Sequence, residues 1–313
     1  MPRPASRFVH EVRTLRYQGA SAVAKATLQA LAGYAAMSVP ATQPAWRKLA
    51  ALGEQLAAVR PTEPMARNLV RWFVCELKQR GHPTVSGKAW SQLVREVESE
   101  ISYRVRGAEA AVVQVGVKLV RPGQVIFTHC HSSVAEGILT AAYGAGKRFT
   151  VYHTETRPLF QGHVTHQNLR QALVPTVMVA DSAAAFLVSK HSGDDVQVDW
   201  VLLGADSLGR DGSSMNKIGS FGIALAAYDS KIPVYVAASL LKLDWFGESR
   251  LELRDGSELW PGAPKGTRLL NYAFDRVPAR YIRGFITEVG IVRPAQVARQ
   301  ALRHCPWLNH RPR

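Results

Sequence analysis

Residues 124–153, QVIFTHCHSSVAEGILTAAYGAGKRFTVYH, decide the fold. The apolar run 124–128 (QVIFT) predicts a short buried strand, and residues 133–143 (SVAEGILTAAY) are rich in types that favour helix. Residues 148–153 (RFTVYH) predict the next strand. A strand, a helix and a second strand in so short a segment are typical of a βαβ unit, so we expect parallel strands covered by helices.

The same alternation of strands and helices continues towards the C-terminus and is absent from residues 1–110. Residues 20–36 are instead rich in helix formers, and prolines separate the helical segments that follow. The predicted fold class is α/β, with an N-terminal helical domain (1–110) followed by a Rossmann-like, doubly wound parallel sheet domain (111–313). In the second domain we expect further strands at 176–180, 198–203 and 234–237, and helices at 167–173, 183–190 and 218–230.

The composition is that of an ordinary globular protein. Of 313 residues, 47% are hydrophobic and 20% charged, which argues against disorder. Three cysteines do not support a disulfide framework and indicate a reducing compartment, so we expect the cytoplasm. No apolar run reaches the roughly 18 residues that a membrane-spanning helix needs, so we expect no membrane association.

The net charge of +15 raises nucleic acid or an anionic ligand as a partner. The 39 lysines and arginines are spread along the chain and form no basic block interleaved with aromatics, so we do not expect a nucleic-acid partner. Two explanations of the positive charge remain: binding of phosphorylated small molecules, or a surface that is generally basic. Neither GxGxxG nor GxxxxGK[ST] occurs, so no motif points to a dinucleotide or to a P-loop nucleotide.

Polar residues follow each predicted strand. The carboxyl ends of parallel strands lie at one edge of such a sheet, and ligands bind there. We therefore expect the chemistry at this edge. The residues concerned are THCHSS at 128–133, TETRP at 154–158, Asp181-Ser182, GAD at 204–206 and Ala238-Ser239.

Two of these residues are suited to proton transfer. Cys130 precedes the predicted helix 133–143, and the positive end of the helix dipole would lower the pKa of its thiol and favour a thiolate. Asp206 precedes a glycine-rich turn, 207–214, and an aspartate in a closed pocket can carry a proton near neutral pH. The plainer interpretations are a buried apolar cysteine and an aspartate that caps a turn.

Two other patterns bear on ligands. Asn216-Lys217 offers an amide for a sugar hydroxyl and an ammonium for a phosphate, although most lysines are simply exposed. His129-Cys130-His131 raises a metal site. Neighbouring strand residues point to opposite faces, and no CxxC or HExxH supplies further ligands, so we expect no metal.

Five segments together resemble one known family. It joins ribose-1,5-bisphosphate isomerase, 5-methylthioribose-1-phosphate isomerase and the alpha, beta and delta subunits of eukaryotic translation initiation factor 2B. The resemblance runs from about residue 18 to about residue 292, and ETRP with a downstream NKIG is its specific part. The family fold, a helical domain followed by a Rossmann-like domain, agrees with the one expected above. The segments are THCHSS (128–133), ETRPLFQG (155–162), DSAAA (181–185), GADSLGRDGSSMNKIGS (204–220) and FITEVG (285–290).

The resemblance implies roles for single residues. Cys130 matches the cysteine that takes the proton from the sugar C2, and Asp206 matches the aspartate that relays a proton between oxygens. The chain keeps both residues, as the catalytic members do. No cofactor is implied, and the implied partners are a phosphorylated pentose and further copies of the chain in a homodimer or homohexamer. Implied substrate contacts are Gln18, Gly19, Ala20, Ser21, Arg60, Ser132, Ser133, Asn216, Lys217 and Lys242.

THCHSS and the RPT segment at 60–62 look more like the ribose bisphosphate group, so we expect conversion of ribose 1,5-bisphosphate to ribulose 1,5-bisphosphate. The chain departs from the family at Gln18, where an arginine is usual, and at His163, where a basic residue often follows QG. An isomerase of another pentose 1-phosphate, such as 5-methylthioribose 1-phosphate, therefore stays open. A non-catalytic regulatory subunit that binds a nucleotide or sugar phosphate, activation by AMP, and hydride rather than proton transfer also stay open.

Overall fold

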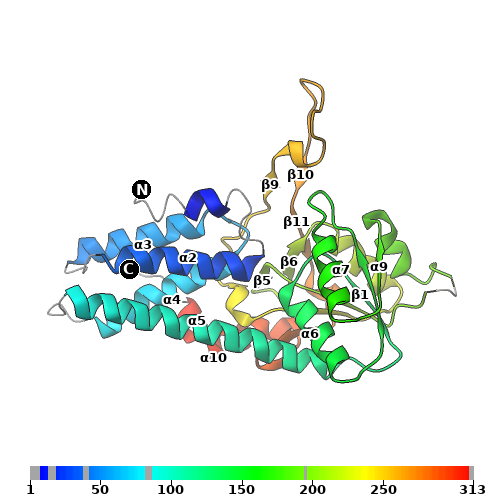
Figure 1. The fold of residues 1–313 in the computed structure, drawn as a ribbon, viewed down its shortest axis with the longest axis horizontal. Helices are drawn as coiled ribbons and strands as arrows, with labels where there is room; N and C mark the ends of the chain where they lie inside the picture. Colours follow the sequence, from blue (N-terminus) through cyan, green and yellow to red (C-terminus); the bar gives the residue numbers. More distant parts are fainter. Residues whose placement is uncertain (1–7, 13–18, 38–41, 82–86, 194–195, 310–313) are drawn as a thin grey trace. The chain divides into compact units, whose positions relative to one another are not determined.

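The computed structural model describes residues 8–12, 19–37, 42–81, 87–193 and 196–309. The chain forms two compact units. One combines 1–107 with 241–249 and 301–313, and the other combines 108–240 with 250–300. The first is helical and the second contains the large sheet (Figure 1).

The first unit is built on three helices that pack against one another, α2, α3 and α4. Prolines stand at the starts of α3 and α4, where the missing N–H costs nothing, and Thr42 caps α3 by accepting a hydrogen bond from the N–H of Ala45 (3.4 Å). The expected helix at 20–36 is confirmed. The bounds are α2 Ala20–Ala35, α3 Gln43–Ala57, α4 Pro64–Arg80 and α5 Gly87–Val117, the last of which ends in the second unit.

The second unit is organised around a seven-stranded sheet of order β13-β12-β7-β4-β1-β2-β3. Every neighbouring pair is parallel except β12 with β13, and β1 and β4 lie at the centre. The expected α/β class with a doubly wound parallel sheet is therefore confirmed. The strands are β1 Val125–Thr128, β2 Thr150–Thr154, β3 Thr176–Val179, β4 Trp200–Leu203, β7 Val234–Ala237, β12 Gly284–Thr287 and β13 Gly290–Val292.

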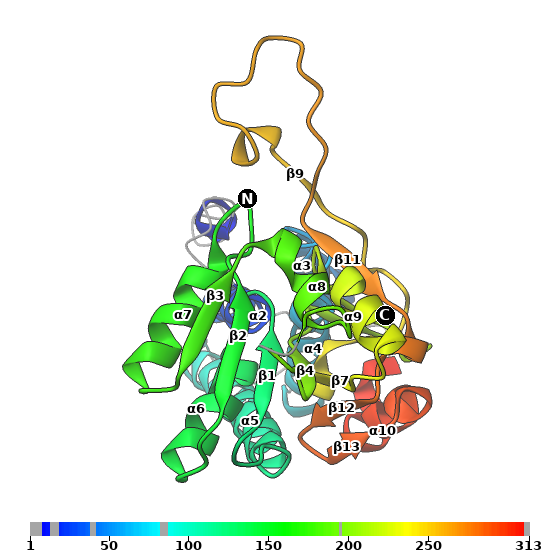
Figure 2. The ribbon, with the colours of Figure 1, turned by 90° about the vertical axis from the view of Figure 1, so that its right-hand side faces the viewer.

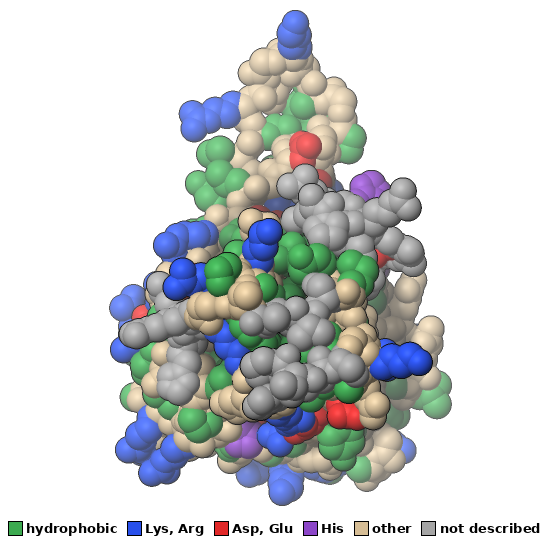
Figure 3. Space-filling model, turned by 90° about the vertical axis from the view of Figure 1, so that its left-hand side faces the viewer, with side chains coloured by type: hydrophobic (Ala, Val, Ile, Leu, Met, Phe, Trp, Pro, Cys, Tyr) green, Lys and Arg blue, Asp and Glu red, His purple; other side chains and the backbone are tan. Residues whose placement is uncertain are grey.

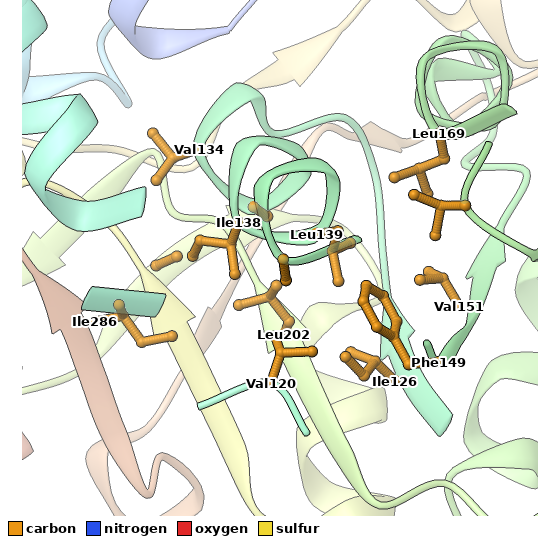
Figure 4. Close-up of a cluster of buried hydrophobic side chains, with 14 of the residues drawn as sticks. Val120, Ile126, Val134, Ile138, Leu139, Phe149, Val151, Leu169, Leu202 and Ile286 are labelled. Atoms are coloured by element: carbon orange, nitrogen blue, oxygen red, sulfur yellow. The ribbon is translucent and has the colours of Figure 1, made fainter. Parts of the chain in front are cut away.

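Helices cover both faces of this sheet (Figure 2). On one face α6 (Ser133–Gly144) and α7 (Gln161–Gln171) pack side by side, and Ile138 and Leu139 of α6 lie over Ile126 and Leu202 of the sheet (Figure 4). On the other face α9 (Ser220–Asp229) packs on β4 and β7, with α8 (Ala184–Leu187) beside it.

The structure corrects three expectations about elements. The helix expected at 183–190 is a single turn, α8, at Ala184–Leu187. The glycine-rich segment 207–214 is not a simple turn, because β5 (Ser207–Gly209) and β6 (Ser214–Lys217) form an antiparallel hairpin, and β11 (Phe274–Val277) pairs with β6. The helix expected at 167–173 begins six residues earlier, because α7 starts at Gln161. Further elements of the second half are β8 Leu243–Asp244, β9 Leu253–Arg254, β10 Asn271–Tyr272 and α10 Val297–His304.

The surface is consistent with the scattered charge of the sequence. On the face in Figure 3, lysine and arginine side chains stand singly or in small groups at several places, with hydrophobic and other polar side chains between them. Among the described helices, none combines the length and the apolar composition that crossing a bilayer requires.

Ile138 tests how tightly α6 packs. Its side chain is fully buried, and a Cβ added at Gly116 would lie 2.3 Å from its Cδ1. Ile138→Ala should lower the free energy of unfolding by about 2–5 kcal/mol because it leaves a cavity, and Ile138→Val by about 0.5–1.5 kcal/mol. Urea unfolding followed by tryptophan fluorescence measures both values. Equal, small losses in the two variants would contradict this packing.

Candidate active site

The loops that follow β1, β2 and β3 lie side by side at the carboxyl edge of the sheet, because β2 pairs in parallel with both neighbours. The second loop is tied to the third. The carboxylate of Asp181 accepts hydrogen bonds from the backbone N–H groups of Thr156 (2.8 Å) and Arg157 (2.7 Å). The polar residues that follow these three strands therefore gather at one edge, as the sequence predicts.

Cys130 lies in the first of these loops and is buried, with 7% of its surface exposed. Its φ of 65° is in the left-handed region, which costs a residue with a side chain about 1–3 kcal/mol. The backbone N–H donates to Oγ1 of Thr156 (3.1 Å), and the hydroxyl of Thr165 lies 3.1 Å from the Cys130 carbonyl oxygen. The thiol donates towards Oε1 of Gln161, 3.6 Å away. The loop after β2 and the helix α7 that follows it thus hold the cysteine.

The expectation of a thiolate at Cys130 is wrong. Burial raises the pKa of the thiol to about 12, although the positive charge of Lys217 lowers it; the negative charges of Asp206 and Asp181 raise it further. The start of α6 does not outweigh the loss of water around the sulfur. At neutral pH the thiol therefore carries its proton.

Asp206 and Lys217 belong to the hairpin that follows β4. The N–H of Asp206 donates to the carbonyl oxygen of Met215 (2.8 Å), which joins the end of β4 to β6. Lys217 is 5% exposed, and its Nζ lies 5.0 Å from the centre of the Phe274 ring. The charges of Asp206 and Lys217 both act on Cys130, so the structure brings these three predicted residues into one electrostatic cluster.

The other predicted residues of this unit belong to β6 and to the start of α6. Asn216 is buried, and its amide donates to Oγ of Ser220 (2.9 Å). Ser132 caps α6 by accepting a hydrogen bond from the N–H of Ala135 (3.4 Å), and the exposed Ser133 is the first residue of the helix. Gly204 leaves room for this cap, because a Cβ there would lie 2.7 Å from Oγ of Ser132.

The remaining predicted contacts belong to the helical unit. Gly19, with a φ of 84°, precedes α2, and Ala20 and Ser21 are its first two residues. Arg60 and Lys242 are both 8% exposed. The last predicted contact, Gln18, lies outside the described residues.

His129 is a core residue with two hydrogen-bond partners. Its Nδ1 lies 2.6 Å from Oγ1 of Thr154, and its Nε2 lies 2.9 Å from the carbonyl oxygen of Ile218. Burial lowers the pKa of the imidazole to about 4, so the ring is neutral at pH 7. Within the part of the chain that the structure describes, no group of three or more His, Cys, Asp or Glu side chains is arranged to hold a metal ion.

Sequence reasoning missed Gln161, the first residue of α7, whose side-chain oxygen accepts from the thiol of Cys130. The signal was the QG pair of ETRPLFQG. Gly162 is required there, because a Cβ would lie 1.9 Å from the carbonyl oxygen of Thr154, and this close approach sets α7 against the end of β2. Thr156 and Asp181 were placed at the correct edge but given no role.

Known proteins resemble this chain over nearly its whole length. A model of the initiation factor 2 subunit family matches residues 16–294. Ribose 1,5-bisphosphate isomerase of Haloferax volcanii is 35% identical over 300 residues, covering 93% of this chain and 89% of the relative. Methylthioribose-1-phosphate isomerase of Pelotomaculum thermopropionicum is 34% identical over 268 residues, covering 79% and 71%. The solved structure of Pyrococcus horikoshii OT3 translation initiation factor eIF-2B has a TM-score of 0.78 at 26% identity, covering 95% of this chain and 99% of that one.

Alkylation by iodoacetamide tests the state of the thiol. In a Cys75→Ser/Cys305→Ser variant, Cys130 is the one remaining cysteine of the three. The reagent attacks the thiolate, so a pKa near 12 predicts a rate that rises about tenfold for each pH unit between pH 7 and pH 10. Mass spectrometry of the labelled peptide gives the rate. A rate that levels off below pH 8 would show a thiolate at neutral pH and contradict the burial effect.

Proposed function

The chain belongs to the initiation factor 2 subunit family, and we propose that it converts ribose 1,5-bisphosphate to ribulose 1,5-bisphosphate. It is a sugar-phosphate isomerase, as are relatives 34–35% identical over most of its length. The observation that carries the proposed chemistry is the cluster of a buried thiol, an aspartate and a buried ammonium at Cys130, Asp206 and Lys217. A thiol and a carboxyl group together can move two protons, and this reaction needs two.

In the proposed mechanism the free enzyme shares one proton between Cys130 and Asp206. The neutral thiol passes its proton to the carboxylate as substrate binds, which leaves a thiolate and a carboxylic acid with the same total charge. The positive charge of Lys217, which already lowers the pKa of the thiol, favours the thiolate form.

The isomerisation then balances without a cofactor. Asp206 donates its proton to the ring oxygen as the bond from C1 to that oxygen breaks, and the Cys130 thiolate takes the proton from C2. The electron pair of the C2–H bond forms the C1–C2 double bond of an enol phosphate. Asp206 takes the proton from the C2 hydroxyl while the thiol of Cys130 returns its proton to C1, which yields the C2 ketone. Both side chains end as they began, and the phosphate stays on C1.

The start of α6 supports a phosphate contact. Ser132 and Ser133 stand at the N-terminus of this helix, two and three residues beyond Cys130. Helix N-termini favour anions because their N–H groups and dipole point towards them. We propose that the C1 phosphate binds here, with Lys217 as a further positive charge. Arg60 and Lys242, from the helical unit, are proposed contacts on the strength of the family resemblance alone.

A second candidate substrate is 5-methylthioribose 1-phosphate. Gln18 stands where the family usually has an arginine, and His163 stands where a basic residue often follows QG. Loss of a cation weakens a clamp for a second phosphate. The relative from Pelotomaculum thermopropionicum is named for that substrate. A regulatory role without catalysis is not favoured, because these relatives are isomerases and the chain keeps both Cys130 and Asp206.

We also propose that the chain forms a homo-oligomer through α9. This helix buries Ile223, Ala224 and Ala227 against the sheet. Its opposite face is also apolar and is exposed, with Phe221 at 38%, Leu225 at 42% and Tyr228 at 56%. A helix that is apolar all round is usually buried, so this face is suited to a second copy of the chain.

Catalytic variants test the proposed chemistry. Cys130→Ser and Asp206→Asn should each lower kcat for ribose 1,5-bisphosphate by about 10²- to 10⁴-fold, because each removes one proton-transfer group. Formation of ribulose 1,5-bisphosphate, followed by ³¹P NMR, measures the rate. Cys75→Ser is the matched control and should keep the wild-type kcat.

Three results of that experiment would be decisive. Wild-type rates in either variant remove that residue from the chemistry. Turnover of 5-methylthioribose 1-phosphate with a higher kcat/KM than ribose 1,5-bisphosphate replaces the proposed substrate by the second candidate. No turnover of either compound contradicts the proposed function.

A charge on α9 tests the oligomer. Leu225→Glu should shift the mass measured by analytical ultracentrifugation to that of a monomer, because it buries an unpaired carboxylate in the interface. Leu173→Glu, at a leucine that is 77% exposed beyond the end of α7, is the matched control and should keep the wild-type mass. An unchanged mass for Leu225→Glu would place the interface elsewhere.

A further inference from the structure

We propose that His129, Thr154 and Thr156 are positioning residues: one directed chain of hydrogen bonds runs through them and fixes the backbone from which the Cys130 thiol projects. The proposal deepens the proposed function and rests on it, since it concerns the group that would take the proton from C2. It adds three side chains that the implied site does not include.

The four contacts of this chain follow one another without a gap. The N–H of Cys130 lies 3.1 Å from Oγ1 of Thr156, and that hydroxyl lies 2.9 Å from Oγ1 of Thr154. The Thr154 hydroxyl lies 2.6 Å from Nδ1 of His129, and Nε2 of His129 lies 2.9 Å from the carbonyl oxygen of Ile218. The chain therefore joins the loop after β1 to the loop after β2 and to the end of the β6 hairpin.

The direction of every bond is determined. The carbonyl of Ile218 can only accept, so Nε2 of His129 carries the ring proton, and Nδ1 of the neutral ring accepts. Thr154 must then donate to Nδ1, which uses its one proton. Thr156 must in turn donate to Thr154, and its oxygen accepts the N–H of Cys130, which can only donate. Each hydroxyl gives one hydrogen bond and receives one, so neither can change partner without leaving another group unsatisfied.

The surroundings hold this chain in place. Its three side chains are almost fully buried: His129 is 2% exposed, Thr154 0% and Thr156 1%. Water therefore cannot replace a lost partner. Asp181 fixes the position of Thr156 by accepting the backbone N–H groups of Thr156 and of the next residue. Gly219, with a φ of 104°, leaves space for the imidazole, because a Cβ there would lie 3.3 Å from its Nε2.

This arrangement explains how a cysteine keeps a left-handed backbone. A φ of 65° at Cys130 persists only where neighbouring groups over-determine it. Thr156, which receives the N–H of Cys130, itself has a φ of 63° and is held by Asp181. Loss of the Thr156 hydroxyl would leave the Cys130 N–H buried without an acceptor, and the loop would relax. A small displacement of a reacting group is enough to slow a reaction strongly.

A matched pair of variants tests the proposal. Thr156→Val keeps the shape of the side chain and removes the hydroxyl, whereas Thr156→Ser keeps the hydroxyl. Thr156→Val should lower kcat for ribose 1,5-bisphosphate about 10²-fold and leave KM within about threefold, because binding groups stay in place while the thiol moves. Thr156→Ser should restore kcat to within about threefold of the wild type. Thr140→Val is the control, because the hydroxyl of Thr140 bonds only to carbonyl oxygens of its own helix, α6.

Alkylation of Cys130 by iodoacetamide gives a second readout that needs no substrate. In the background without the other two cysteines, Thr156→Val should raise the alkylation rate at pH 8 at least about tenfold, because a relaxed loop exposes the sulfur, and Thr156→Ser should not. If the wild type turns over no sugar phosphate, the proposed function fails, and the alkylation rates still decide whether the hydroxyl positions the thiol.

Thr154 provides an independent test should Thr156→Val fail to fold. Its hydroxyl lies one step further along the chain and makes no hydrogen bond to Cys130. Thr154→Val should reproduce the loss of kcat and the faster alkylation. Thr154→Ser, which keeps the hydroxyl, should have the kcat and the alkylation rate of the wild type. Rates of turnover and alkylation within threefold of the wild type in a folded valine variant at either position would overturn the proposal. A serine variant as impaired as its valine counterpart would also overturn it.

Discussion

The site depends on one constraint: Cys130, which is buried, must adopt a left-handed backbone conformation that glycine usually takes. Cys130, in the loop after β1, keeps this conformation because Thr156, in the loop after β2, accepts its N–H and Thr165 of α7 donates to its carbonyl oxygen. The parallel order of β1, β2 and β3 brings those loops together. The sheet therefore does more than support the site, since the register of its strands fixes the position of the sulfur.

The same burial sets the chemistry. Removal of water raises the pKa of the Cys130 thiol to about 12, and Lys217 and Asp206 act on it with opposite signs. A permanently ionised thiolate would react with oxidants and alkylating agents, whereas a neutral thiol is far less reactive. We infer that reactivity appears only when a substrate completes the cluster and the thiol and carboxyl groups exchange their shared proton. A basic residue beside the pair makes that exchange less costly.

Much of the fold could be predicted from short patterns, and much of the site could not. The runs at 124–128, 176–180, 198–203 and 234–237 lie at β1, β3, β4 and β7, because buried parallel strands are short, apolar and rich in β-branched residues. The β5–β6 hairpin was missed because its glycines and serines are rare in strands. The pKa of Cys130 was misjudged because the helix start is visible in a sequence and burial is not. Gln161 and the hydroxyl chain need three-dimensional neighbours that no spacing reveals.

The central claim is that Cys130 moves a proton from C2 to C1 of a phosphorylated pentose. Isomerisation of ribose 1,5-bisphosphate in D₂O, with the product examined by ¹H NMR and mass spectrometry, tests it most directly. Cys130 returns the original hydrogen to C1 unless its thiol first exchanges with solvent, so the account predicts that deuterium accumulates at C1 when the reaction is held at equilibrium through many turnovers. A product that still carries only the original hydrogen at C1 after many turnovers would mean hydride transfer, and it would contradict the role assigned to the thiol.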